Sequence, residues 1–424
     1  MARKVVDEAA AARPEGARAP MRDFWLVLSG QALSMQADGL ANLAVLWWIA
    51  QDTGSVGLAT ALAAATMVPV IVLGPVAGVV IDRYSRRGVM MVTDLVRAGA
   101  AALIAWGIAS GTMQLWMLVA AATVSAACRA FHRPALQASF PQLVPESQLN
   151  RANSLFQMAD AAANLIAPPV GGALVAWLGT GGVVGISAAT YVLAAAMLFL
   201  AVIPPVARGM GAAGDRALAG GRVRRFVGEM ADGFTYLWHG QRMLFFMLCT
   251  FALVNFAMTP IGPLLPFVAE QRLGLDAAGY GFLLSSMTVG TLAGAVGMSV
   301  AGARIRRGIA VLWSLVVIGL ALLAVGGLTV VAPVVAAFVV MGVALSVANV
   351  CASTLFQTRV PREIQGRVFA VRSSISQAAG PLALALVGAL SASVAPHVIL
   401  VVSGVIVVGG GVLGYAVPGL AAAE

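Results

Sequence analysis

The chain has 424 residues, of which 60% are hydrophobic and only 10% are charged, and its mean hydropathy is +0.92. Soluble domains carry about 25% charged residues, so this composition excludes an ordinary soluble enzyme, a disordered protein and a nucleic-acid-binding domain. The 26 basic and 17 acidic residues give a net charge of +9, and in so apolar a chain the question is which face of a membrane these charges occupy.

Apolar stretches long enough to cross a bilayer recur along the whole chain. A helix needs about 20 apolar residues to span the hydrocarbon core. The stretches predict an all-α membrane protein with twelve transmembrane helices, at 24–49, 56–81, 88–109, 113–136, 151–178, 182–203, 243–269, 279–302, 308–329, 332–356, 364–391 and 396–417.

The longest connection divides the chain into two groups of six spans. We expect a tail at 1–23, an N-terminal six-helix bundle at 24–203, a linker at 204–242, a C-terminal bundle at 243–417 and a short tail at 418–424. The linker holds Pro204, Pro205 and a basic segment, and residues from about 224 to 240 predict an amphipathic helix on the membrane surface.

Basic residues segregate to one side of this topology. With the N-terminus inside, 24 of the 26 lie on or near the same face; Arg272 lies opposite and Arg97 lies within a span. The excess of arginine on one face predicts that both termini are cytoplasmic, and that the chain is a multi-pass protein of a bacterial inner membrane.

The two groups of spans also repeat short patterns. One pattern recurs at an offset of 216 residues, from Phe140, Val144, Pro145 and Arg151 to Phe356, Val360, Pro361 and Arg367. Parallel repeats of this kind relate the two bundles of many transporters by a pseudo-two-fold axis, so we expect that architecture here.

Three acidic residues lie within the apolar spans, namely Asp38, Asp94 and Asp160. A charge in the bilayer centre costs at least about 2.5 kcal/mol, so such residues face a cavity or a partner. Asp38 and Asp160 are the candidate proton-coupling residues; a hydrogen-bonded structural role is the alternative for each. Asp94 and Arg97 are three residues apart on one helix face, which predicts a structural or gating ion pair.

The polar, uncharged residues inside spans are the candidate lining of a substrate cavity: Gln31, Gln36, Asn42, Asn164, Asn255 and Asn349. His132, His239 and His397 lie near span ends and are interpreted as interfacial. The three cysteines are far apart and are interpreted as small core residues, so neither a metal site nor a disulfide is expected.

An acid and several arginines follow a span rich in small residues at 74–87. We interpret this loop as a conformational latch, a set of contacts that breaks and re-forms between two states. The residues assigned to the latch are Gly78, Asp82, Arg83, Arg86, Arg87, Asp94, Arg97 and Arg367.

A second motif predicts a bend in two corresponding spans, because proline interrupts helical hydrogen bonding and glycine permits close packing. Its residues are Pro168, Pro169, Gly171 and Gly172 in the fifth span and Gly380 and Pro381 in the eleventh.

These motifs resemble those of major facilitator superfamily transporters over nearly the full chain. The 74–87 loop resembles the superfamily's signature loop, and 167–172 resembles the motif typical of proton antiporters, with Ala167 where glycine is usual. The segments 131–136, 143–146 and 366–369 are similar to the macrolide-efflux and enterobactin-exporter branch. The family's arginine on the fourth helix would fall near Ser125; Arg129, one turn away, is the candidate to replace it.

The resemblance implies a twelve-helix fold, alternating access and export driven by a proton gradient. We therefore expect an exporter of hydrophobic or amphipathic small molecules that exchanges them for protons, works as a monomer among membrane lipids, and uses no cofactor and no nucleic acid. No nucleophile–base or metal constellation suggests an enzyme. The alternative is an uncoupled facilitator or importer of a lipid or metabolite with the same fold.

Overall fold

The computed structural model describes residues 21–203, 234–238, 242–301, 306–417 and 420. Most of the predicted N-terminal tail and of the 204–242 linker lies outside the described residues. The predicted C-terminal tail, apart from residue 420, and the side chain of Asp82 also lie outside them. Residues 234–238 of the linker are helical, within the range predicted for an amphipathic helix.

The N-terminal bundle consists of long helices joined by short turns. These helices are α2 (Met21–Trp48), α3 (Val56–Arg83), α4 (Arg86–Ala109), α5 (Leu115–Leu143) and α6 (Leu149–Leu200), with a π-helix η1 (Ile49–Thr53) and a 3₁₀ turn η2 (Glu146–Gln148). Serine side chains cap two of the helix starts: Ser55 accepts from the backbone N–H of Leu58 at 3.2 Å, and Ser85 from that of Gly88 at 3.1 Å. Such caps satisfy N–H groups that have no partner inside the helix.

α6 comprises two segments that reverse direction at Gly179. This glycine has φ 69° and ψ 170°, a backbone conformation open to a residue without a Cβ atom. Gly39 of α2 packs on Ala167, and Gly30 of α2 packs on Ala194. The two contacts are nine residues apart on α2 but 27 residues apart on α6. The chain of α6 therefore runs along α2 and then folds back along it, which forms the two spans predicted at 151–178 and 182–203.

The C-terminal bundle begins with a broken helix. α8 (Arg242–Met258) and α9 (Ile261–Gln271) together occupy the span predicted at 243–269, and they are separated at Pro260, which cannot donate a helical hydrogen bond. The remaining helices are α10 (Ala277–Ala301), α11 (Arg307–Gly327), α12 (Val331–Arg359), α13 (Arg362–Leu390) and α14 (Pro396–Gly414).

Among the described residues, ten helices are long and apolar enough to cross a membrane, with 146–200 counted as one. The predicted total of twelve requires the two segments of α6 to be counted separately and α2 to be added. α2 is not among the ten, and it carries Arg22, Asp23 and Asp38 within its length.

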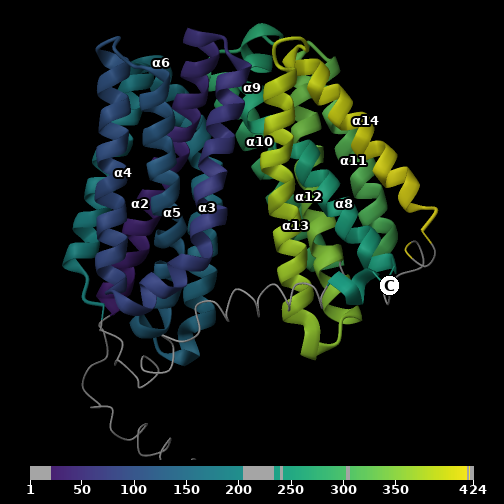
Figure 1. Cartoon of the computed structure of the whole chain (residues 1–424), viewed down its shortest axis with the longest axis horizontal. Coiled ribbons are helices and arrows are strands. Elements are labelled where there is room, and N and C mark those ends of the chain that lie inside the picture. The colour runs from purple at the N-terminus through teal and green to yellow at the C-terminus, as the bar shows by residue number, and fades with distance from the viewer. Residues whose placement is uncertain (1–20, 204–233, 239–241, 302–305, 418–419, 421–424) are drawn as a thin grey trace, which may run out of the picture.

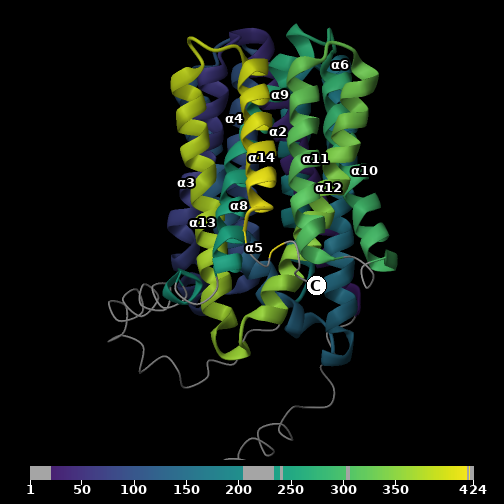
Figure 2. The same cartoon turned by 90° about the vertical axis from the view of Figure 1, so that its right-hand side faces the viewer.

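The two bundles lie side by side, and α10 crosses from one to the other to pack on α6 (Figure 1; turned by 90° in Figure 2). At this contact Gly172 faces the backbone of Ala277, and Gly281 faces the backbone of Pro168, so closely that a Cβ atom on either glycine would clash. A second contact joins α3 to α13. Small residues let membrane helices approach in this way.

Among the described residues, the contacts between the bundles lie towards one end of the molecule, which we call the closed end. Along α3, Thr60 and Met67 contact α13, but Gly74 and Gly78 on the same helix face are exposed and have no neighbour within 4 Å of an added Cβ. Along α10, Ser285 contacts α6, whereas Val296 is 65% exposed. The bundles therefore diverge towards the end at which α2 begins, here called the open end (Figure 1).

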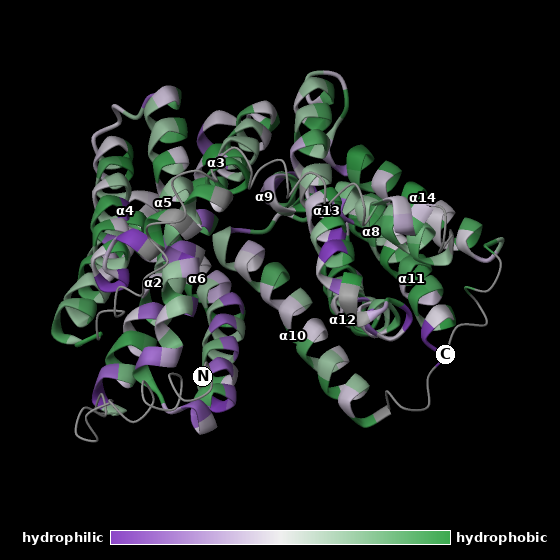
Figure 3. Ribbon diagram, turned by 60° about the horizontal axis from the view of Figure 1, so that its bottom comes forward, coloured by the Kyte–Doolittle hydropathy of each residue, from purple (hydrophilic) through white to green (hydrophobic). Residues whose placement is uncertain are grey.

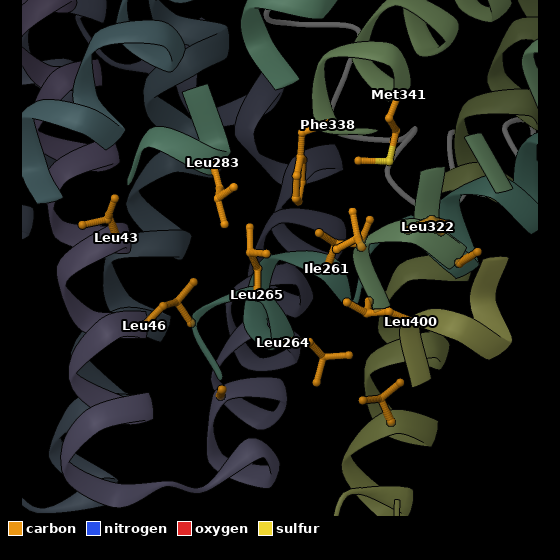
Figure 4. Close-up of a cluster of buried hydrophobic side chains, with 14 of the residues drawn as sticks. Leu43, Leu46, Ile261, Leu264, Leu265, Leu283, Leu322, Phe338, Met341 and Leu400 are labelled. Carbon is orange, nitrogen blue, oxygen red and sulfur yellow. The ribbon is translucent and has the colours of Figure 1, made fainter. Parts of the chain in front are cut away.

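Apolar side chains join the bundles near the closed end. Leu43 and Leu46 of α2 belong to one buried cluster with Leu265 of α9 and Leu283 of α10 (Figure 4). Trp47 stacks on Tyr280 with ring centroids 5.8 Å apart. Hydrophobic residues dominate α11 and α14, whereas hydrophilic ones gather in the N-terminal bundle near α2, α4 and α5 (Figure 3). Those three helices position the site.

Candidate functional site

The guanidinium of Arg97 on α4 is the centre of a buried polar network. Its side chain is only 2% exposed. Nη2 forms an ion pair with Oδ1 of Asp38 and lies 3.2 Å from the hydroxyl of Tyr191, while Nη1 donates to Ser34 at 3.0 Å and to Asp94 at 3.2 Å. The guanidinium also lies over the Tyr191 ring, 4.3 Å from its centroid. Three helices, α2, α4 and α6, thus converge on one fixed cation.

Asp38 on α2 has two further partners. The hydroxyl of Tyr191 donates to its Oδ1 at 2.8 Å, and Nη1 of Arg129 lies 3.5 Å from the same atom. The side chains of Asp38 and Arg129 are 29% and 39% exposed, so this part of the network reaches open space. Two arginines balance Asp38 and Asp94, which is how charges are tolerated inside a membrane protein.

The network continues from Arg97 into the bundle. Ser34 donates to Oδ1 of Asp94 at 3.0 Å, and Nδ1 of His132 lies 3.6 Å from the same atom. The two ring nitrogens of His132 lie 2.8 Å from Thr93 and 2.8 Å from Gln31. All of these side chains are buried. The predicted pair of Asp94 with Arg97 is therefore present, but it belongs to the network that contains Asp38.

A cavity of about 260 Å³ lies beside Asp38, between the two bundles. Its polar lining includes Asp38, Asn42, Arg129 and Tyr191. The rest is mainly apolar, and both bundles contribute to it: Val45, Leu46, Leu62, Ala63, Met67, Ala101, Ile104, Ala122 and Val184 from the N-terminal bundle, and Gly262, Pro263 and Leu384 from the C-terminal bundle. Mostly apolar walls with a few placed polar groups are typical of sites for small molecules.

Of the residues predicted to line a cavity, Asn42 does so, but Gln31 is buried against His132 instead. Gln36, Asn164, Asn255 and Asn349 are not part of this lining. The last three donate to the backbone carbonyl one turn earlier in their own helices, at 2.8, 2.9 and 3.0 Å respectively. A polar side chain in a span can thus be satisfied locally, without facing a cavity.

Asp160 stands apart from the network. It is half-buried on α6, and within the described part of the chain its carboxyl has neither an ion-pair partner nor a place in the cavity lining. The structure therefore separates the two predicted proton-coupling residues, since only Asp38 is held by arginines beside the cavity.

Two network residues were not expected from the sequence. Tyr191 lies in an otherwise apolar span, where a phenol is the natural candidate to hydrogen-bond an intramembrane acid; that was the missed signal. His132 was interpreted as interfacial because it lies near a span end, and this was wrong: it is 5% exposed and faces α2 and α4. Arg129, the predicted replacement for the family arginine, does reach the cavity.

Two arginines of the predicted latch, Arg86 and Arg87, hydrogen-bond to backbone carbonyls of the N-terminal bundle. Arg86 donates to the carbonyl of Ala138, and Arg87 donates to the carbonyls of Leu198, at 2.9 Å, and Phe199. Gly78, Arg83 and Arg367 are exposed, and the side chain of Asp82 is outside the described part. Arg97 contacts Asp38, and Asp94 is joined to that network through Arg97 and Ser34, so the predicted latch set divides into two places.

The motif at Pro168 and Pro169 does not break α6, whose only non-helical backbone among the described residues is at Gly179. The prolines lack N–H groups, so the carbonyls of Asn164 and Leu165 have no helical partner. Hydroxyls from α10 replace those partners: Thr288 donates to the Asn164 carbonyl at 3.4 Å and Ser285 to the Leu165 carbonyl at 3.0 Å. With Gly172 on Ala277, the motif thus makes a contact between bundles; Gly171 packs on α2.

The corresponding motif in α13 is also part of a contact between bundles. α13 continues through Pro381. A Cβ atom on Gly380 would lie 3.2 Å from the terminal carbon of Met67 on α3 and 3.4 Å from the hydroxyl of Thr259. Both motifs therefore lie where the bundles meet.

Comparison with known proteins gives consistent results. The chain is 26% identical to macrolide efflux protein A of Streptococcus pyogenes over 369 residues, which cover 86% of this chain and 88% of that protein. It is 26% identical to multidrug efflux pump Tap of Mycobacterium tuberculosis over 381 residues, 88% of each chain.

Solved structures share the fold at low sequence identity. A bacterial homologue of the human lysosomal transporter Spinster, in an inward-facing and unoccupied conformation, superposes with a TM-score of 0.71 at 14% identity and covers 94% of this chain and 97% of its own. A bacterial homologue of the iron transporter ferroportin gives 0.67 at 17% identity, over 92% and 99%. The family model of the Major Facilitator Superfamily matches residues 27–384 and 261–422, and the chain belongs to that superfamily.

Proposed function

We propose that this transporter exports hydrophobic or amphipathic small molecules across a bacterial inner membrane in exchange for protons. The names of the relatives, macrolide efflux protein and multidrug efflux pump, support efflux of drug-like compounds. The observation that carries the proposal is the position of Asp38, a carboxyl that lines the mainly apolar cavity and is held by Arg97 and Arg129.

Exchange requires that a proton and the substrate do not occupy the site together. A proton on Asp38 removes one negative charge from the cavity and leaves Arg129 without its carboxylate. A deprotonated Asp38 offers a negative charge to a cationic or polarised group on the substrate. Protonation therefore changes the affinity of the cavity for its substrate, which is the coupling that antiport needs.

Export also requires the cavity to open to each side in turn. The excess of basic residues on that face supports a cytoplasmic position for the open end and for both termini. In this orientation the structure is an inward-open state. In the outward-open state the contacts at the closed end must break, including those between α6 and α10.

The two hydroxyls of α10 give a prediction about this step. Replacing Ser285 by alanine together with Thr288 by valine should weaken the closed end by about 1–3 kcal/mol, because each hydrogen bond is worth about 1 kcal/mol and its loss leaves a carbonyl unpaired. Spin-label distances across the closed end should show about a tenfold gain of separated ends relative to closed ends. Ser299→Ala, which removes a bond internal to α10, is the control. An unchanged distance distribution in the double variant would contradict the assignment.

The proposed function is tested with inside-out membrane vesicles. In these vesicles an exporter moves its substrate into the lumen, so export is measured as uptake. We expect an imposed pH gradient, acidic inside, to drive uptake of a macrolide and of a lipophilic cationic dye, and an ionophore that exchanges protons to stop it. Uptake that only equilibrates the compound, with the same rate after the gradient is collapsed, would instead support the uncoupled facilitator.

A further inference from the structure

A second carboxyl, that of Asp94, lies in the network but away from the cavity. It is fully buried and does not belong to the cavity lining. Its Oδ1 accepts from Ser34 and Arg97, but its Oδ2 is buried and has no hydrogen-bond partner. A buried carboxylate oxygen without a donor is costly. A proton on Oδ2 neutralises the carboxyl and displaces neither of the donors on Oδ1.

Arg97 is shared between the two carboxyls. Its Nη2 faces Asp38 and its Nη1 faces Asp94. One guanidinium carries one positive charge, so it balances one carboxylate in full. Arg129 supplies a second charge, but it contacts Asp38 and not Asp94. Asp94 therefore depends on Arg97, whereas Asp38 has an alternative partner.

The other ionisable groups around Asp94 come from four helices: Asp38 on α2, Arg97 on α4, Cys128, Arg129 and His132 on α5, and Tyr191 on α6. Thr93 donates to backbone carbonyls of its own helix, at 2.9 and 2.8 Å, and so accepts from Nδ1 of His132. Nε2 of His132 is then an acceptor. When the Gln31 amide is turned by 180°, its nitrogen, which otherwise has no partner, donates to Nε2.

This arrangement suits a neutral imidazole. His132 then adds no charge beside Asp94, and Arg97 is the one cation in contact with that carboxyl within the described part of the chain.

Apolar residues separate Asp94 from the open end of the bundle. About one turn nearer the open end than Gln31, Asp94 and His132 lie Leu28 of α2, Met90 of α4 and Leu136 of α5. All three belong to one buried cluster with Phe24 and Phe140. The polar contacts of Asp94 lead instead to Ser34, Arg97 and so to Asp38. The hydrogen bonds of Asp94 therefore connect it to the cavity side of the network.

We propose that Asp94 is a second proton-holding carboxyl, which shares Arg97 with Asp38 so that a proton on either carboxyl gives the arginine to the other. The inference rests on the proposed function in so far as Asp38 carries the coupling proton. A proton that arrives at Asp38 leaves Arg97 paired with Asp94; a proton on Asp94 leaves both arginines to Asp38. No covalent bond other than the O–H bond changes. The two carboxyls then titrate as a pair in two apparent steps.

The test reads the carboxyls directly, by infrared difference spectroscopy of the purified full-length protein between alkaline and acidic pH. We expect the C=O band of a protonated, fully buried carboxyl that is lost in Asp94→Asn and displaced in frequency in Asp94→Glu. In Asp38→Asn the band is kept but appears at a lower pH, because Arg97 then pairs with Asp94 alone. The exposed acid Glu146 supplies the control, because Glu146→Gln should leave the band unchanged. Where Asp94→Asn does not fold, Ser34→Ala serves in its place: it removes a donor to Oδ1, so the band should appear at a higher pH.

Transport gives an independent readout. With Asp94 neutral, Arg97 belongs to Asp38 alone, so protonation of Asp38 needs a proton concentration about tenfold higher and the pH profile of efflux moves to the acidic side. A carboxyl band and a pH profile that both survive Asp94→Asn would overturn the proposal. If efflux by the wild-type protein does not depend on the proton gradient while the carboxyl band still depends on Asp94, the proton coupling of Asp38 is refuted. The assignment of Asp94 as a proton-holding carboxyl is then retained.

Discussion

Replacing Asp38 by asparagine is expected to reduce proton-driven uptake into inside-out vesicles to the background of membranes without the transporter. Asparagine keeps the shape of the side chain and a carbonyl oxygen that can accept from Tyr191 and Arg97. It cannot bind and release a proton, so a gradient has nothing to act upon. The bundle should still assemble, because Arg97 retains Asp94 as its counter-ion.

A comparison of two transport modes separates coupling from folding. Substrate exchange without a gradient, measured as counterflow of a labelled against an unlabelled compound, should continue in the Asp38→Asn variant at a measurable rate. Asp160→Asn provides the matched change in the same bundle, at a carboxyl without an arginine partner in the described part of the chain, and we expect it to keep most of the gradient-driven uptake. Full gradient-driven uptake by Asp38→Asn, or its loss in Asp160→Asn alone, would transfer the coupling role away from Asp38.

The positions of the helices followed from the sequence because a bilayer imposes a length and an apolar character on each span. The predicted spans agree with the helices of both bundles to within several residues, and the reversal at Gly179 separates two of the predicted spans. The interruption of the seventh span was not predicted, although Pro260 marks it. The contact that Pro168 and Pro169 make between the bundles was not predicted either, because a sequence does not show that another helix supplies the missing hydrogen bonds.

The site could be predicted only as far as single helices allow. An intramembrane acid and a spacing of three residues were sufficient to identify Asp38 and the pair of Asp94 with Arg97. Their union in one network depends on how α2, α4 and α6 are rotated about their axes, and the sequence does not specify that rotation. For the same reason Asn164, Asn255 and Asn349 were assigned to a cavity lining although none of them lines the cavity beside Asp38, and Tyr191 was overlooked.

The same network predicts a large difference in stability between its two arginines. At alkaline pH, where Asp94 is a carboxylate, Arg97→Leu should destabilise the folded protein by about 3–5 kcal/mol, because it removes one partner of a buried ion pair and leaves Asp94 with an uncompensated charge. Arg129→Leu is the matched control, because it deletes the same group from a side chain that is 39% exposed and that contacts a single carboxyl, at 3.5 Å. Its loss should therefore cost much less stability. Thermal unfolding in detergent measures both.

A double variant isolates the cause of that loss. If Arg97→Leu destabilises the protein through the unpaired carboxylate of Asp94 rather than through lost packing over Tyr191, then adding Asp94→Asn should restore a large part of the stability. Replacing both members of a buried ion pair costs far less stability than removing one of them. Asp38 keeps Arg129 in this double variant and so stays compensated. A double variant no more stable than Arg97→Leu would show that the guanidinium stabilises the bundle through its contacts with Tyr191 and Ser34 rather than through the charge of Asp94.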